Sequence, residues 1–96
     1  MQLQEFQNQI GAIYGERDAA RGISATVAWI AEEVGELAQA VRKESPGRQT
    51  HELGDVLAWI ASLANQLGLS LEDAASRFSN GCPHCGSSPC HCGTHR

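Results

Sequence analysis

The chain has 96 residues and a formal net charge of -4 at pH 7. This is one domain, close to the size at which a single core is marginal, so self-association would help it. The absence of any lysine and arginine cluster excludes a nucleic-acid surface, and no uninterrupted apolar run reaches the roughly 18 residues of a membrane span. The first residues also lack a basic region before an apolar run, so we expect a soluble, cytoplasmic protein without a membrane partner.

Two helices are predicted in the first half of the chain. Residues 2–20 carry apolar side chains three and four positions apart, and Gly22 supplies a stop. The same spacing recurs over 25–43, with Ser24 as the expected N-cap and a break at 45–47.

Two more helices are predicted before the composition changes. The third covers residues 48–67 and ends at Gly68, while Ser70 opens a short fourth helix with a capping-box pattern. We expect that helix to fade near Ser79, and no strand alternation appears. The sequence therefore predicts an all-α fold resembling a four-helix bundle over residues 1–80, followed by a cysteine-rich tail over 81–96.

Five acidic residues form two clusters in these apolar helices. Glu32, Glu33 and Glu36 make one patch, and Glu52 and Asp55 project together from the next helix. Antiparallel packing would bring Glu33 and Glu36 opposite the second pair. Carboxylates grouped in apolar surroundings favour a hard cation such as Mg²⁺, although a solvated face is the alternative interpretation. No histidine falls within the clusters, which disfavours zinc or oxygen-activating iron.

The apolar residues of both central helices form stripes. On residues 25–43 the stripe is Val27, Ile30, Val34, Leu37 and Val41, and on 48–67 the expected core stripe is Leu53, Val56, Leu57, Ile60, Leu63, Ala64 and Leu67. Because the first of these helices is apolar nearly all round, we expect it to be buried on more than one side. This favours a homodimer or higher homo-oligomer, with the substrate pocket close to the interface.

Two tryptophans lie one helical turn from the acidic residues. Trp29 precedes the first cluster and Trp59 follows the second, so antiparallel helices would place both indoles toward one end of the acidic patch. They are candidates for binding a flat ligand, and simple packing is the alternative.

The ordered pair Glu-Glu-x-x-Glu and Glu-x-x-Asp resembles the signature of the MazG-like superfamily, the all-α nucleoside triphosphate pyrophosphohydrolases. Residues 30–38 and 52–57 are similar to its two core segments, and the resemblance covers about residues 5–80. It implies Mg²⁺-dependent hydrolysis of nucleoside triphosphates to the monophosphate and pyrophosphate. Phosphoribosyl-ATP pyrophosphohydrolase activity, or a non-catalytic interaction module, is the alternative.

The resemblance also implies roles for individual residues. The metal ligands would be Glu33, Glu36, Glu52 and Asp55. Glu32 would be an auxiliary carboxylate, and Arg77 and Asn80 are similar in position to phosphate-binding residues of the family. Other cations near helix ends that could bind phosphate are Arg17, Arg21, Arg42, Lys43 and Arg48.

All four cysteines lie in the tail, at Cys82, Cys85, Cys90 and Cys92. Cys-x-x-Cys followed by Cys-x-Cys predicts a structural Zn²⁺ site with four thiolates. An iron-sulfur or other metal site, disulfides and free thiols remain alternatives. The histidines that could replace a thiolate are His84, His91 and His95.

Overall fold

The computed structural model describes residues 1–43 and 45–93, which contain four helices and a nonhelical segment after the fourth. The helices are α1 (Leu3–Arg21), α2 (Ile23–Lys43), α3 (Pro46–Leu67) and α4 (Leu71–Ser76). These described ranges contain no strand, so the all-α prediction is confirmed. None of their helices combines the length and apolar character needed to cross a membrane.

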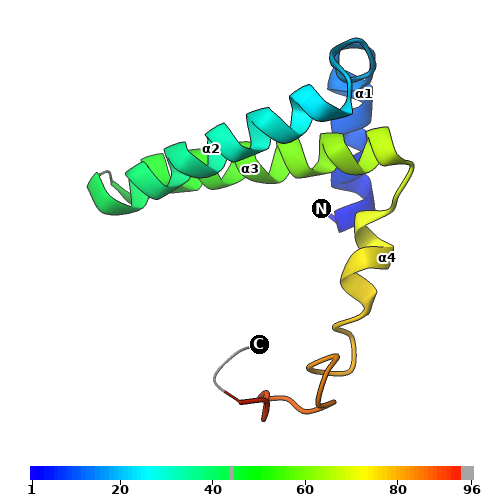
Figure 1. Cartoon of the computed structure of the whole chain (residues 1–96), viewed down its shortest axis with the longest axis vertical. Coiled ribbons are helices and arrows are strands. Elements are labelled where there is room, and N and C mark those ends of the chain that lie inside the picture. The colour runs from blue at the N-terminus through cyan, green and yellow to red at the C-terminus, as the bar shows by residue number, and fades with distance from the viewer. Residues whose placement is uncertain (44, 94–96) are drawn as a thin grey trace.

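The helices α2 and α3 lie side by side and antiparallel, and α1 crosses them near the end of α3 (Figure 1). Gln49 Nε2 donates to the carbonyl of Ala40 at 3.3 Å near the loop. Toward the other end the rings of Trp29 and Trp59 stack. Figure 1 shows α4 continuing away from the α2/α3 pair, toward the cysteine-rich segment.

A single glycine joins α1 to α2. Gly22 has a φ of +89°, a conformation that side chains disfavour, and its N–H bonds the carbonyl of Asp18. Its own carbonyl accepts from both the backbone N–H and the hydroxyl of Thr26. The helix therefore begins at Ile23, and the prediction that Ser24 is its N-cap is wrong.

The other helix ends follow local sequence signals more closely. Ser45 caps α3 by accepting from the N–H of Arg48, and Pro46 is in the first turn rather than in a loop. Gly68 ends the helix in the left-handed conformation, with a φ of +67°. Ser70 caps α4 by accepting from the N–H of Asp73, as the capping-box pattern predicts.

The core differs from the predicted apolar stripes. Small and polar residues fill it, because they let the helices approach closely: Thr26, Ala40, Ala61, Ser62 and Ala64 are buried, with Ile10 and Val56. Much of each stripe is exposed instead, as Val27, Val34 and Val41 on α2 and Leu53, Leu57, Ile60 and Leu67 on α3. The expectation that the α3 stripe forms the core of one chain is therefore wrong, apart from Val56 and Ala64.

A buried glutamine fixes α1 to the turn between α3 and α4. Gln7 is 4% exposed, and its amide nitrogen donates to Asn65 Oδ1 at 2.9 Å and to the Leu69 carbonyl at 2.8 Å. Its amide oxygen accepts from the N–H of Leu71 at 2.8 Å. Asn65 Nδ2 returns a bond to the Gln7 carbonyl. This network sets the crossing of α1 and the start of α4.

The chain is extended for its length. Its Cα radius of gyration is 15.6 Å, whereas a compact domain of this size would have about 12.5 Å. The difference reflects the two long helices and the arm formed by α4 and the segment after it (Figure 1).

Candidate active site

Carboxylates from α2 and α3 converge in the middle of the helix pair. Oxygens of Glu33, Glu36 and Glu52 lie within 4.8 Å of one another. Glu33 and Glu36 are one turn apart on α2, and Glu52 faces them from α3 because the two helices are antiparallel. The packing expected from the sequence therefore brings these three residues together.

Glu52 is the most enclosed member of the cluster, with 2% of its surface exposed. Its Oε1 pairs with Arg48 Nη2 at 2.8 Å, one turn earlier on α3. Its Oε2 is buried and has no hydrogen-bond partner among the described residues. A buried ionised oxygen without a partner is costly, so this atom favours the binding of a cation at the site.

Glu33 has a perturbed acidity. Burial raises the pKa of its carboxyl above the ordinary value, and the negative charges of Glu36, Asp55 and Glu52 raise it further. Its Oε2 is a second buried oxygen for which the described part of the chain supplies no partner. All four carboxylates proposed as ligands are therefore close enough to interact electrostatically.

Asp55 lies close to Glu52 of the cluster, and a histidine lies close to both. His51, Glu52 and Asp55 form a second group with ligand atoms within 4.8 Å. His51 Nε2 lies 3.4 Å from Asp55 Oδ2, one turn along α3. The sequence interpretation overlooked His51 because it stands just before the acidic segment, although its spacing of four from Asp55 puts both on one face.

Glu32 stands apart from these groups. It is exposed on α2, and neither set of convergent ligand atoms includes it. Its position next to Glu33 in the sequence turns it to a different direction around the helix.

A cavity of about 260 Å³ adjoins the cluster on the α1 side. Its lining includes Asp55 and Trp59 from α3 and Tyr14, Arg17 and Arg21 from α1. Two cations and two aromatic rings thus lie beside a carboxylate of the cluster. A smaller cavity of about 160 Å³ is lined by Glu36, Gln39, Ala40, Arg48 and Glu52.

The two tryptophans pack against each other. Their ring centroids are 5.8 Å apart and their planes differ by 12°. The guanidinium of Arg21 lies 4.6 Å from the ring centroid of Trp59, a distance at which a cation is attracted to the ring. Trp29 is 44% exposed. The indoles therefore have a packing role in the chain and leave surface available to a ligand.

Arg77 and Asn80 lie elsewhere. Both follow α4 and are exposed. The Arg77 guanidinium lies over the ring of Phe78, and Arg77 lines a cavity with residues of the cysteine-rich segment rather than with the carboxylates. Arg48 pairs with Glu52, and Arg17 and Arg21 line a cavity with Asp55.

The donor set fits a hard divalent cation. Oxygens bound to one Mg²⁺ at about 2.1 Å can be at most about 4.2 Å apart. The ligand oxygens of Glu33, Glu36 and Glu52 lie within 4.8 Å of one another, so small side-chain rotations would bring them close enough to share the ion. The buried unpartnered oxygens of Glu33 and Glu52 would gain the positive charge they lack.

These features define a class: an all-α protein with a carboxylate-rich site on two antiparallel helices. A family model described as the MazG nucleotide pyrophosphohydrolase domain matches residues 21–84. The match spans more than half of the chain, so the chain belongs to this family. It begins and ends later than the segment 5–80 expected from the sequence, and it supports nucleotide pyrophosphohydrolase activity in general terms. A comparison with curated proteins found no match.

Proposed function

We propose that the protein hydrolyses nucleoside triphosphates to nucleoside monophosphate and pyrophosphate in a Mg²⁺-dependent reaction. The observation that carries the proposal is the convergence of carboxylates from α2 and α3, with buried unpartnered oxygens on Glu33 and Glu52. The family match makes a nucleotide the substrate class. The cytoplasmic location expected from the sequence stays a prediction.

The metal-binding role falls to Glu33, Glu36, Glu52 and Asp55. When bound, the cation neutralises negative charge that develops on the phosphate oxygens. The raised pKa of Glu33 follows from burial and from the charges of its neighbours, and positive charge at the cluster would reverse that effect. Glu32 is proposed as the auxiliary carboxylate that orients the attacking water, which its exposure permits.

The rest of the substrate needs cations and apolar surface. Arg17 and Arg21 line the cavity beside Asp55 and suit the triphosphate, while Trp59 supplies an aromatic wall. Trp29 extends that wall through its stacking contact. Arg77 and Asn80 remain proposed phosphate-binding residues, and this requires that they reach the site of a second chain, because α4 extends away from the α2/α3 pair (Figure 1).

We also propose that the working form is a homodimer or higher homo-oligomer. The exposed stripe residues come one position after residues at the contact between α2 and α3. Val34 follows Glu33 on α2, and Leu53 follows Glu52 on α3. One position is about a quarter turn around a helix, so in two antiparallel helices both stripes lie on the same side of the pair. An apolar face of this extent is rarely left in water. The 260 Å³ cavity is also below the roughly 300 to 1,000 Å³ usual for ligand pockets, which favours its completion by another chain.

The test is a panel of canonical, deoxy and modified nucleoside triphosphates, with phosphoribosyl-ATP, scored for Mg²⁺-dependent pyrophosphate release. Glu36→Gln and Asp55→Asn should each lower kcat by about 100-fold or more while helical circular dichroism stays unchanged. Glu5→Gln, on the exposed first turn of α1, is the matched control and should keep full activity.

Two results would contradict the proposal. One is wild-type activity in a folded Glu36→Gln, Asp55→Asn double variant. The other is the absence of pyrophosphate release from every compound in the panel, which would instead favour a non-catalytic module.

A further inference from the structure

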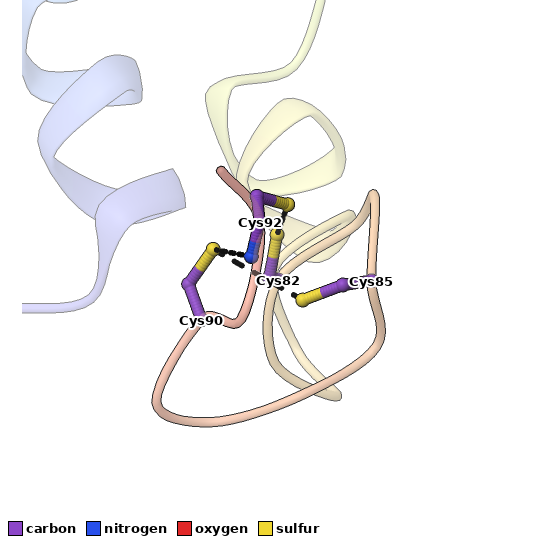
Figure 2. A group of neighbouring side chains, drawn as sticks. All are labelled: Cys82, Cys85, Cys90 and Cys92. Carbon is purple, nitrogen blue, oxygen red and sulfur yellow. Dashed lines mark hydrogen bonds between the residues drawn. The ribbon is translucent and has the colours of Figure 1, made fainter. Parts of the chain in front are cut away.

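The four cysteines of the tail come together although they span eleven residues (Figure 2). Cys82 Sγ lies 3.7 Å from Cys92 Sγ, and Cys85 Sγ lies 4.0 Å from Cys90 Sγ. All four sulfur atoms lie within 4.8 Å of one another. Four thiolates arranged tetrahedrally around zinc, with bonds of about 2.3 Å, have sulfur separations of about 3.8 Å. The observed spacing is therefore that of a tetrahedral thiolate site.

The same distances exclude disulfides in this arrangement. A disulfide requires sulfur atoms about 2.05 Å apart, and all four cysteines are free. The Cys82 and Cys92 pair and the Cys85 and Cys90 pair are each too far apart to be bonded and close enough to share one ion.

Backbone N–H groups point at the sulfur atoms. His91 N donates to Cys85 Sγ at 3.3 Å, and Cys92 N donates to Cys90 Sγ at 3.3 Å. Such donors stabilise thiolates, the form in which cysteine binds metals.

A tight turn holds the first pair of cysteines. Gly86 N bonds the Cys82 carbonyl at 2.7 Å, and Cys82 N bonds the Ser87 carbonyl at 2.9 Å. Gly81 has a φ of +104°, and a Cβ there would lie 3.0 Å from the backbone of Ser87. Glycine at this position therefore permits the close approach that the turn requires.

The tail has no apolar core to hold this arrangement. Residues 81–93 form no helix or strand, and none of them is buried. A segment this short needs a metal or another cross-link to keep one conformation. The convergence of the thiols is therefore not explained by packing.

We propose that Cys82, Cys85, Cys90 and Cys92 bind one structural Zn²⁺, which orders the segment that follows α4. Four soft sulfur ligands fill a tetrahedral shell and leave no open position, which is the pattern of a structural rather than a catalytic zinc. Binding releases the thiol protons to solvent. The family match ends at His84 and includes only the first of these cysteines, so the site is an addition to the MazG domain and does not depend on the proposed function.

The histidines of the tail are not needed as ligands. His84 and His91 are exposed and do not belong to the ligand group. His95, the third candidate from the sequence, lies outside the described residues.

The test measures metal in the full chain, purified under reducing conditions without added zinc and analysed by elemental mass spectrometry. We expect one equivalent of zinc per chain that resists dialysis. Replacement by Co²⁺ should give the visible absorption of tetrahedral cobalt bound to thiolates. Cys85→Ser and Cys90→Ser should each weaken zinc binding by about 100-fold or more. Ser87→Ala, which keeps the backbone N–H and carbonyl of the turn, should bind normally.

Three outcomes would overturn the inference. These are less than half an equivalent of tightly held metal with all four thiols freely reactive, iron in place of zinc, and a chain mass that shows two disulfides. Helical circular dichroism of each variant serves as the folding control, because α1, α2 and α3 contain no cysteine. Pyrophosphate release is measured separately, so failure of the zinc site is distinguishable from failure of the proposed enzyme.

Discussion

Single atoms at the acidic cluster set the energetics of the site. Glu52 is nearly fully buried, yet Arg48 neutralises only one of its oxygens. The Arg48 side chain is 55% exposed, so solvent weakens this pair. The free oxygen of Glu52 and that of Glu33 therefore carry a cost in the folded chain, which a bound cation would remove.

Glu33 gives a pH-dependent prediction. Its folded pKa is raised by burial and by neighbouring carboxylates, so its contribution to stability is present at low pH and lost as pH rises through the folded pKa. Without metal, Glu33→Gln should therefore be more stable than wild type near neutral pH, and the difference should vanish at acidic pH. Added Mg²⁺ should raise the melting temperature of the wild type more than that of the variant.

The measurement is thermal unfolding from pH 4 to 8, in chelator and in Mg²⁺. Glu16→Gln, an exposed carboxylate on α1, is the control and should follow the wild type throughout. A Glu33→Gln variant that is less stable than the wild type at pH 7 in chelator would contradict the assigned electrostatics.

At the scale of helices, side-chain amides hold α1 against α3 and the turn before α4, a contact that the apolar pattern does not predict. Gln7 satisfies backbone groups of the turn between α3 and α4, at Leu69 and Leu71, and also pairs with Asn65. Gly11 allows this approach, because a Cβ there would lie 3.2 Å from Asn65 Nδ2. The position of α1 therefore depends on partly buried polar contacts between α1 and the end of α3.

Gln7→Leu should lower the free energy of unfolding by about 2 to 4 kcal/mol, because it leaves the Leu69 carbonyl and the Leu71 N–H without partners. Urea unfolding followed by circular dichroism measures the change. Gln9→Leu, at an exposed position on the same helix, should change stability by no more than about 0.5 kcal/mol. Equal losses of unfolding free energy in the two variants would show that the Gln7 network contributes no more to stability than an exposed glutamine does.

At the scale of the whole molecule, one chain leaves much of its apolar surface exposed. Its radius of gyration exceeds that of a compact domain, and the stripes of α2 and α3 are exposed. A second copy that covers the stripes would bury them and build a bundle of four long helices from two chains.

Leu57→Glu tests this arrangement, since it places a charge in the α3 stripe. It should weaken self-association by about 30-fold or more, as measured by size-exclusion chromatography with light scattering. Ile13→Glu, an exposed apolar position on α1 outside both stripes, should leave the oligomer intact. A wild-type chain that is purely monomeric at micromolar concentration would refute the proposed assembly.

Much of the secondary structure could be predicted because its signals are local. Gly22, Gly68 and Ser70 end or begin helices through their own backbone preferences and side-chain bonds, and the structure has them in these roles. The resemblance of the two acidic segments to the MazG-like superfamily indicated the family, and the spacing of the apolar residues predicted the all-α fold. The predicted start of α2 was wrong because the helix begins directly after Gly22. The Gly22 carbonyl accepts hydrogen bonds from the N–H and the hydroxyl of Thr26, and Ser24 does not act as the N-cap.

The sequence alone determined the approximate bounds of the helices, the pairing of Glu33 with Glu36 and of Glu52 with Asp55, and where the cysteines gather, because each depends on residues close together in the chain. Only the tertiary structure decided which side of each helix is buried and that Arg17 and Arg21 line a cavity with Asp55. These outcomes depend on the packing of α1 and α2 against α3. Helical spacing identifies an apolar stripe without specifying whether its partner is the same chain or another one.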